Sequence, residues 1–191
     1  MIKKKKNGSV KTIKIDLGCG ANKKEGFIGI DIYNEKGVDI VLDLNNSKLP
    51  FEDNSVEEIY SSHFFEHVDS VENTLSECVR VLKKGGKLRI IVPHYSNPYS
   101  YHFTHKTYWS SYSLNQEYID YYLKLPLKLN SVKINFANGK FLNYICNFIA
   151  NKYRSVYERG LNSFIKAWEI EFSMTKIQKA GKLKIRKSNA I

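Results

Sequence analysis

The chain has 191 residues and a formal net charge of +11, with 42% hydrophobic and 26% charged residues. These values exclude a disordered chain, a collagen-like repeat and a coiled coil, and they predict one globular domain whose core needs no disulfide or metal. The three cysteines stand far apart, and the N-terminal lysines precede no apolar segment. We therefore expect reduced thiols, no secretory signal and a cytoplasmic protein.

The positive charge is concentrated at the two ends of the chain. Residues 1–14 contain six lysines and residues 176–191 contain six basic residues, with no acid in either segment, whereas the remainder holds 18 basic and 19 acidic residues. We expect basic tails at 1–11 and 177–191 around a single domain at 12–176. Solvated chain ends explain such tails, and attraction to nucleic acid or to an anionic membrane surface is the alternative.

Hydrophobic alternation predicts short strands at residues 12–17, 27–32, 38–42, 56–61 and 87–92. One clear helix begins at the capping box Asp69 to Glu72, and Gly85 and Gly86 are expected to close it. Two later strands are expected at 131–136 and 169–174, the second as an antiparallel edge strand. The alternation of strands with a helix predicts a parallel α/β sheet.

The first predicted strand ends in the turn Gly18-Cys19-Gly20. Glycine tolerates positive φ and lets a ligand approach the backbone, and open parallel sheets bind ligands at the carboxyl ends of their strands. Position 23 is Lys, so the third glycine of a dinucleotide fingerprint is missing. The turn therefore predicts a ligand site, but not a pyrophosphate site.

Three acids lie near this end of three neighbouring strands. Asp31 closes the second strand and suits ribose hydroxyls, Asp43 follows the third and suits an adenine amino group, and Asp16 precedes the glycines and suits an ammonium group. A turn or cap role is the alternative for each acid alone. The three together favour a ligand site.

The order and spacing of these pieces resemble a class I S-adenosylmethionine-dependent methyltransferase. The resemblance covers residues 12–93 and rests on Ile15 to Ala21, Gly29 to Ile32, Asp43-Leu44, Glu66-His67-Val68 and the segment 82–88 before the fifth strand. It implies an α/β, Rossmann-like, doubly wound and mostly parallel sheet of about seven strands with an antiparallel edge strand. It also implies methyl transfer from S-adenosyl-L-methionine, with S-adenosyl-L-homocysteine as the product.

The resemblance also implies which residues bind the cofactor. The turn Gly18, Cys19 and Gly20, with Asp16 before it, would hold the methionine part. Asp31, followed by Ile32, would bind the ribose, and Asp43 with Leu44 the adenine edge. Ser62 and His63 would line the methionine and sulfonium side.

The sequence departs from the family pattern in one place. Only ten residues separate Gly20 from Asp31, too few for the helix that the family usually has there. A short turn is expected at 21–26. The chain is similar in this to a small-domain subtype that often accompanies surface-glycan biosynthesis.

Residues His63 to His67 also fit the pattern H-x-x-E-H of some zinc hydrolases. That chemistry needs both histidines on one face of a helix, and here the helix is expected to be absent or very short. His102 and His105 have a spacing that permits chelation, but no acidic partner stands near them in their loop. We therefore expect no metal site.

The loop expected at 94–125 is rich in aromatic residues and contains three histidines. Its place after the fifth strand predicts an acceptor loop or lid over the cofactor. Methyl transfer to a hydroxyl benefits from a general base, and histidine has a suitable pKa. His94, His105 and His67 are the candidates, while hydrogen bonding within the lid is the alternative for each.

These observations favour methyl transfer to a small-molecule or glycan-type acceptor, which the basic half at 78–175 predicts to be anionic. A methyltransferase acting on RNA or another nucleic acid is the alternative, and a non-catalytic cofactor-binding scaffold is a further one. The amphipathic stretch 140–159 is expected to cover the sheet or to contact a membrane peripherally. The oligomeric state is left open.

Overall fold

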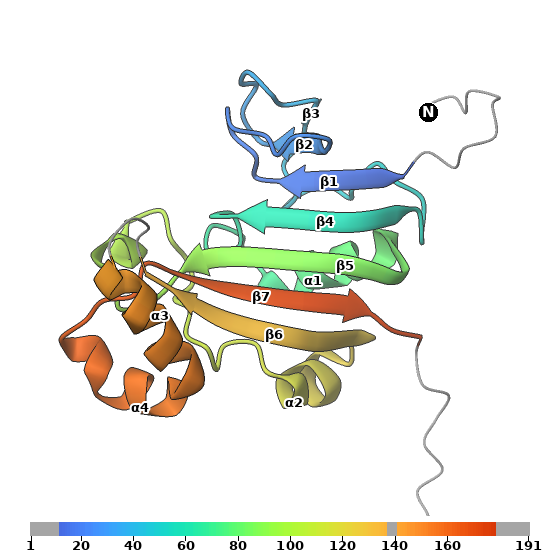
Figure 1. The fold of residues 1–191 in the computed structure, drawn as a ribbon. Coiled ribbons are helices and arrows are strands. Elements are labelled where there is room, and N and C mark those ends of the chain that lie inside the picture. Colours follow the sequence, from blue (N-terminus) through green and yellow to red (C-terminus); the bar gives the residue numbers. More distant parts are fainter. Residues whose placement is uncertain (1–11, 137–140, 179–191) are drawn as a thin grey trace, which may run out of the picture.

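The fold is organised around one seven-stranded sheet with the strand order β3-β2-β1-β4-β5-β7-β6. The structure, a computed structural model, describes residues 12–136 and 141–178 (Figure 1). Its strands are β1 Ile13–Leu17, β2 Ile28–Asp31, β3 Ile40–Val41, β4 Val56–Ser62, β5 Leu82–Pro93, β6 Leu127–Asn135 and β7 Glu169–Lys176. Its helices are α1 Val71–Val81, η1 Pro98–Tyr101, α2 Gln116–Tyr118, η2 Ile119–Leu123, α3 Phe141–Lys152, α4 Arg154–Arg159 and η3 Leu161–Ser163.

Strands β1 to β5 pair in parallel, so their carboxyl ends meet at one edge of the sheet, on the left in Figure 1. This confirms the Rossmann-like, mostly parallel sheet. The antiparallel strand β7 lies between β5 and β6 rather than at the edge. The expectation of an edge strand at 169–174 is therefore wrong, and β6 is the edge strand on that side of the sheet.

Helix α1 begins where the sequence predicts, because the Ser70 side chain accepts a hydrogen bond from Asn73 N–H at 3.2 Å. Its end differs from the prediction. The helix stops at Val81, and β5 starts at once with Leu82, so that Gly85 (φ +79°) and Gly86 lie inside the strand. The two glycines thus bend the start of β5 instead of capping a helix.

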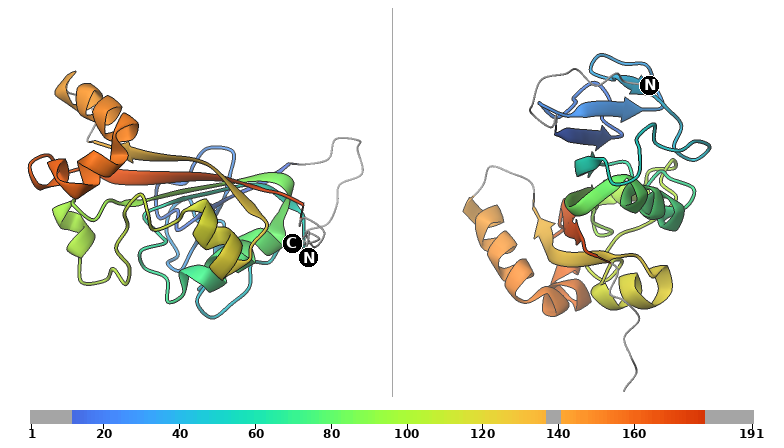
Figure 2. Two further views of the ribbon diagram at one scale, coloured as in Figure 1. Left: turned by 90° about the horizontal axis from the view of Figure 1, so that it is seen from below. Right: turned by 90° about the vertical axis from the view of Figure 1, so that its right-hand side faces the viewer.

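The two faces of the sheet are covered differently. Helices α1 and α2 lie on one side, over the apolar core, and α3 lies on the other side near the carboxyl edge (Figure 2). The segment between β1 and β2 contains no helix, as predicted. No helix therefore covers the sheet face beside this segment. The strand residues on that face are polar and form ion pairs, Lys14 with Glu58 at 3.0 Å and Arg89 with Glu171 at 2.7 Å.

Helix α3 protects the free edge of β6. Asn151 accepts a hydrogen bond from Ile134 N–H and donates one to Ile134 C=O, and Asn147 accepts one from Phe136 N–H. Two asparagines of α3, Asn147 and Asn151, therefore satisfy backbone groups that an edge strand leaves unpaired.

The amphipathic stretch is buried on one side and exposed on the other. Cys146, Ala150 and Tyr157 pack into the core, whereas Tyr144 and Phe148 stay more than half exposed. None of the helices in the described part of the chain has the length and apolar content needed to cross a bilayer. The predicted tail at 1–11 and all but two residues of the tail at 177–191 lie outside the described residues.

Candidate active site

In the Gly-Cys-Gly turn after β1, the first glycine packs closely against a side chain and the second faces open space. Gly18 has a φ of +67°, and a Cβ on it would lie 2.5 Å from Cβ of Phe64. Gly20 has a φ of +49°, but a Cβ there would meet nothing within 4 Å. The turn therefore presents bare backbone at the carboxyl edge of the sheet.

Asp31 ties the ends of β1 and β2 together. One carboxylate oxygen accepts the N–H of Gly20 at 2.9 Å, and the other accepts the N–H of Tyr33 at 3.0 Å. Each oxygen keeps a second lone pair that can accept a hydroxyl group. Ile32, half exposed, stands beside it with its side chain at the surface.

Asp43 forms the turn after β3. Its oxygens accept the N–H of Asn45 at 3.0 Å and the side-chain amide of Asn46 at 2.6 Å. Leu44 packs against the core behind it. The turn interpretation and the ligand interpretation of Asp43 are compatible, because a carboxylate has about four acceptor positions.

Asp16 and Cys19 form the buried floor of this edge. Asp16 accepts the N–H of Lys24 at 2.8 Å, yet burial raises its pKa, and the neighbouring Asp31 adds to the effect. Burial and the two carboxylates also raise the pKa of the Cys19 thiol to about 11. The floor therefore favours a positively charged ligand group, and Cys19 is a neutral packing residue. All three cysteines are free, as predicted, and the structure also buries them.

The segment after β4 is a turn, which confirms the expectation that H-x-x-E-H has no helix here. Ser62 ends β4, and His63 follows with a φ of +56°, its N–H bonded to Ile91 C=O at 2.9 Å. Nδ1 of His63 lies 3.3 Å from Glu66. This contact raises the pKa of His63, although burial acts in the opposite direction.

A pocket of about 260 Å³ opens beside these residues. Four histidines line it, His63 and His67 from the segment after β4 and His102 and His105 from the loop after β5. The rings of His67 and His105 are 4.7 Å apart between centroids. Tyr99 and Trp168 form an aromatic wall, with their ring centroids 5.7 Å apart.

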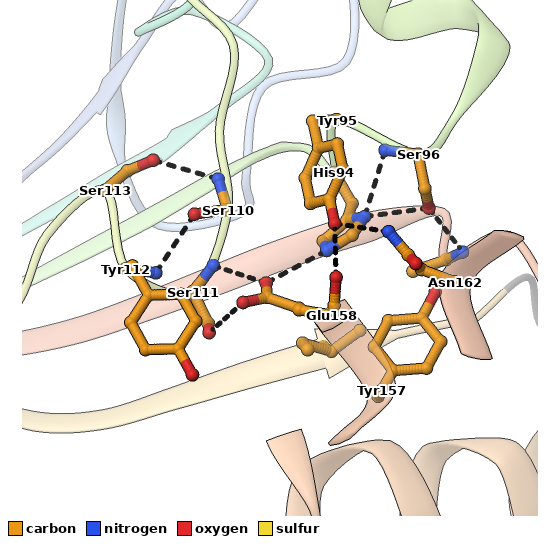
Figure 3. A network of polar contacts seen from close by, with 12 residues as sticks. His94, Tyr95, Ser96, Ser110, Ser111, Tyr112, Ser113, Tyr157, Glu158 and Asn162 are labelled. Atoms are coloured by element: carbon orange, nitrogen blue, oxygen red, sulfur yellow. Dashed lines mark hydrogen bonds and ion pairs between the residues drawn. The ribbon is translucent and has the colours of Figure 1, made fainter. Parts of the chain in front are cut away.

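His94 lies elsewhere. Its side chain is fully buried, Nδ1 accepts the N–H of Ser96, and Nε2 lies 3.2 Å from Glu158 (Figure 3). Glu158 on α4 also accepts the N–H and the hydroxyl of Ser111, both at 2.7 Å. A base must reach the acceptor, so the burial of His94 favours the alternative expected for it, hydrogen bonding within the loop.

Sequence analysis missed several residues of this region. The sequence-based prediction assigns no site role to Glu66, and Trp168 and Glu158 lie too far along the chain for spacing to predict their approach. Asn97 at the pocket caps η1 through Tyr99 N–H. A signal for Glu66 existed, because the motif H-x-x-E-H contains it.

The comparisons with known proteins agree with this geometry. Residues 15–90 match the family model described as a methyltransferase domain. No curated protein sequence matches the chain. A SAM-dependent methyltransferase from Archaeoglobus fulgidus has a similar structure, with 20% identity, a TM-score of 0.53 and coverage of 86% of each chain. One from Aquifex aeolicus has 15% identity and a TM-score of 0.53, over 88% of this chain and 85% of that one.

A third similar structure contains the cofactor. It is Haemonchus contortus phosphoethanolamine N-methyltransferase 2 in complex with S-adenosyl-L-methionine, with 16% identity, a TM-score of 0.50 and coverage of 90% of this chain and 50% of that one. The match identifies residues 15–90 as a methyltransferase domain, and the similar structures share its Rossmann-like fold. Together they support a methyltransferase enzyme that uses S-adenosyl-L-methionine.

The residues present fit this cofactor. The open backbone at Gly20 leaves room for a ligand chain against the turn. The raised pKa of Asp16 marks a carboxylate without a full counter-charge, which the positive charge of the cofactor can supply.

Proposed function

We propose that the chain transfers a methyl group to a small, glycan-type acceptor held in the histidine pocket. One observation carries the proposal: the pocket is lined by His63, the residue after β4, and by Pro93, the last residue of β5. It is therefore beside the strand ends at which a class I cofactor binds. Its volume is at the small end of ligand pockets, which favours a small group over a large surface.

The proposed cofactor contacts follow the strand ends. Asp31 would accept the ribose hydroxyls beside Ile32, and Asp43 with the Leu44 backbone would contact the adenine edge. The turn Gly18-Cys19-Gly20, with Asp16 below it, would hold the methionine part. Ser62 and His63 would complete the side toward the pocket.

When bound, S-adenosylmethionine supplies a sulfonium methyl group for in-line displacement. The chain contributes orientation and a proton acceptor. His105 Nδ1 lies 2.9 Å from Ser100 C=O and His67 Nδ1 lies 3.2 Å from Thr104 C=O. A carbonyl only accepts, so both Nδ1 atoms carry the proton, and each Nε2 is free to accept one from a hydroxyl.

The walls of the pocket support a sugar-type acceptor. Tyr99 and Trp168 offer flat faces together with a polar edge, the combination that suits sugar rings. The histidines, of which His63 has a raised pKa, favour an acceptor with negative charge. This agrees with the excess of basic residues in the second half of the chain.

We also propose that the protein contacts an anionic membrane peripherally, through exposed apolar and basic side chains of α3 and α4. Tyr144, Phe148 and Val156 are more than half exposed there. The acid of this stretch, Glu158, faces inward, while Lys152 and Arg159 are exposed. Co-sedimentation with anionic but not neutral vesicles would support membrane contact, and no pelleting with either would refute it.

The nucleic-acid alternative depends on the basic tails, which lie almost wholly outside the described residues. It predicts RNA binding with a steep salt dependence, and no binding at low salt would remove it. The scaffold alternative predicts cofactor binding without turnover on any acceptor.

The first experiment is calorimetric titration of S-adenosylhomocysteine into the wild type, Asp31→Ala and the exposed control Asp120→Asn. We expect micromolar binding that Asp31→Ala weakens by about tenfold, or ~1.4 kcal/mol, and that the control leaves unchanged. Methyl transfer from labelled cofactor to sugar acceptors and to RNA then distinguishes the acceptor classes. Transfer to RNA but to no small acceptor would refute the proposal.

A further inference from the structure

The most unusual group in the pocket is the carboxylate of Glu66. Its residue is 1% exposed, and neither oxygen accepts a hydrogen bond from the described part of the chain. The nearby His63 makes a charge contact only, at 3.3 Å. A buried carboxylate without hydrogen bonds is costly, because burial removes water that nothing replaces. Such a group indicates a ligand that the protein atoms alone do not supply.

Two histidines complete a ligand set around it. One atom each from Glu66, His67 and His105 lie within 4.8 Å of one another. Glu66 and His67 come from the turn after β4, and His105 comes from the loop after β5. The loop is held against the turn by its backbone, since Glu66 C=O accepts the N–H of Lys106 at 2.7 Å.

The hydrogen bonds at the two rings fix the tautomer that a metal requires. Nδ1 of His67 and Nδ1 of His105 each face a backbone carbonyl, Thr104 C=O and Ser100 C=O, so both nitrogens carry the proton. Each Nε2 is left with a lone pair. Metal-binding histidines are oriented in this way by a carbonyl or carboxylate on the other nitrogen.

We propose that Glu66, His67 and His105 bind a divalent first-row transition metal ion, of which Zn²⁺ is the natural probe. Two imidazoles and one carboxylate form a known three-ligand set for Zn²⁺ with an open position. Mg²⁺ and Ca²⁺ are disfavoured, because they prefer all-oxygen ligands. A tetrahedral ion with bonds near 2.1 Å needs ligand atoms about 3.4 Å apart, so side-chain rotations of the order of 1 Å close the site.

The ion would lie at the wall of the acceptor pocket, because all three ligands line it. Its open position would hold an oxygen of the acceptor, and with the ion bound the Nε2 atoms of His67 and His105 would be ligands and not proton acceptors. The metal site itself stands independently of the acceptor, and only this use of it rests on the proposed function. The proposal also revises the sequence-based expectation of no metal site. That expectation was based on the lack of an acid near His105 in the sequence, and the fold brings Glu66 to this position.

The test is equilibrium dialysis and calorimetry with Zn²⁺ on tag-free protein, without cofactor or acceptor, repeated with Co²⁺ to read the ligand field by visible absorption. The three cysteines are buried and do not compete. We expect one ion per chain in the wild type. Glu66→Gln, His67→Gln and His105→Ala should each weaken binding by tenfold or more.

Two neighbouring variants serve as matched controls. Asp69→Asn removes an exposed carboxylate three residues after Glu66, and His102→Ala removes the other loop histidine in the pocket; both should keep Zn²⁺ affinity within twofold. Unfolding temperatures without metal separate binding from folding. Glu66→Gln should leave the metal-free protein about as stable as the wild type, because it removes a buried carboxylate that accepts no hydrogen bond and has only the His63 charge contact, and should abolish the rise that Zn²⁺ gives.

Three outcomes would overturn the proposal: no binding of Zn²⁺, Co²⁺, Fe²⁺ or Mn²⁺ by the folded wild type; Zn²⁺ binding that persists in Glu66→Gln and His105→Ala; or equal loss in the control variants. The proposed methyl transfer fails separately, because cofactor binding is measured without metal. Intact cofactor binding with no metal affinity would leave His67 and His105 as bases.

Discussion

Gly18 and Gly20 stand two residues apart in the same turn and differ in what surrounds them. Both have positive φ, where a side chain adds roughly 1 kcal/mol or more of strain. Only Gly18 also packs against another side chain, Phe64. Substitutions at the two positions therefore distinguish the cost of backbone strain from the cost of overpacking in this turn.

The substitution Gly18→Ala should destabilise the fold by about 2–4 kcal/mol, because the overpacking against Phe64 adds to the strain. Gly20→Ala should cost only about 1 kcal/mol in stability, since its Cβ meets open space. Because that open space is the proposed ligand cradle, Gly20→Ala should still weaken S-adenosylhomocysteine binding. Urea unfolding and calorimetry check both results. Equal stability loss in the two variants would contradict the packing argument.

What the sequence reveals at the scale of residues depends on separation along the chain. Asp31 and Gly20 are recognisable because each sits at a strand end, and the structure joins them by a hydrogen bond. The approach of His105 to Glu66 is different, since 38 residues of loop, helix and strand lie between them. His94 follows β5 directly, but its burial depends on α4, which local pattern does not place.

At the scale of elements, Glu77 and Arg80 fasten α1 to the segment before β4. Glu77 accepts the N–H of Leu49 at 2.7 Å, and Arg80 bonds to both Glu77 oxygens and to two carbonyls, Leu49 and Phe51. Burial alone would raise the pKa of Glu77, but Arg80 and the Leu49 N–H outweigh it and hold the pKa below its usual range. The ionised form is thus the one that stabilises the fold.

The lowered pKa of Glu77 predicts how the stability of the fold depends on pH. A lowered pKa in the folded state contributes stability that is complete above the unfolded value of about 4.5 and is lost as the pH falls through the folded value. Glu77→Gln should cost roughly 1–3 kcal/mol at pH 7 and should lose less than the wild type on further acidification. Urea unfolding between pH 7 and pH 3 measures this. Parallel curves for the two proteins would contradict it.

The asparagines of α3 allow a second test of an element. Asn151→Ala leaves Ile134 without partners for its N–H and C=O on the side of α3, so we expect a loss of about 1–3 kcal/mol. Asn130→Ala is the control on β6, the strand that Asn151 contacts, because Asn130 bonds to Thr175 at the surface and its loss should change stability by no more than about 0.5 kcal/mol. Thermal unfolding compares them, and an equal effect would refute the edge-capping role.

Elements were predictable where their pattern is local. The strands at the start of the chain and the Ser70 cap follow from alternation and capping rules. The length of β5 and the interior place of β7 do not, because both depend on partners. Leu82 extends β5 by pairing with Val56, and β7 alternates like an edge strand although Phe172 pairs on both sides, with Ile90 and Val132.

At the scale of the whole molecule, the short β1–β2 connection explains why one face of the sheet is polar. Without a helix over it, that face meets water, and its strand positions carry Lys14, Glu58, Tyr60 and Arg89 rather than apolar residues. Arg89 lies 5.6 Å from the Tyr60 ring centroid and pairs with Glu171, so long side chains cover the sheet that a helix would otherwise cover. One missing helix thus accounts for a polar face in a Rossmann-like fold.

The insertion between β6 and β7 holds the loop after β5, the proposed acceptor loop, in place. Glu158 on α4 contacts His94 and Ser111 at the two ends of the segment that carries Tyr99 and His105, and Tyr95 donates to Glu158 C=O at 3.0 Å (Figure 3). Burial alone would raise the pKa of Glu158, but His94 and Ser111 hold it below its usual range. The buried carboxylate therefore couples α4 to the pocket.

Glu158→Ala should loosen this coupling while leaving the cofactor edge intact, because it strands the buried donors of His94 and Ser111. We expect faster hydrogen exchange at 94–113 and 154–163, unchanged exchange in β1 and β4, and an unchanged affinity for S-adenosylhomocysteine. Once an acceptor is known, its KM should rise by at least tenfold. Glu117→Ala, an exposed acid on α2, controls for loss of charge. Exchange that rises equally in β1 and β4 would mean that Glu158 supports the whole fold rather than the loop.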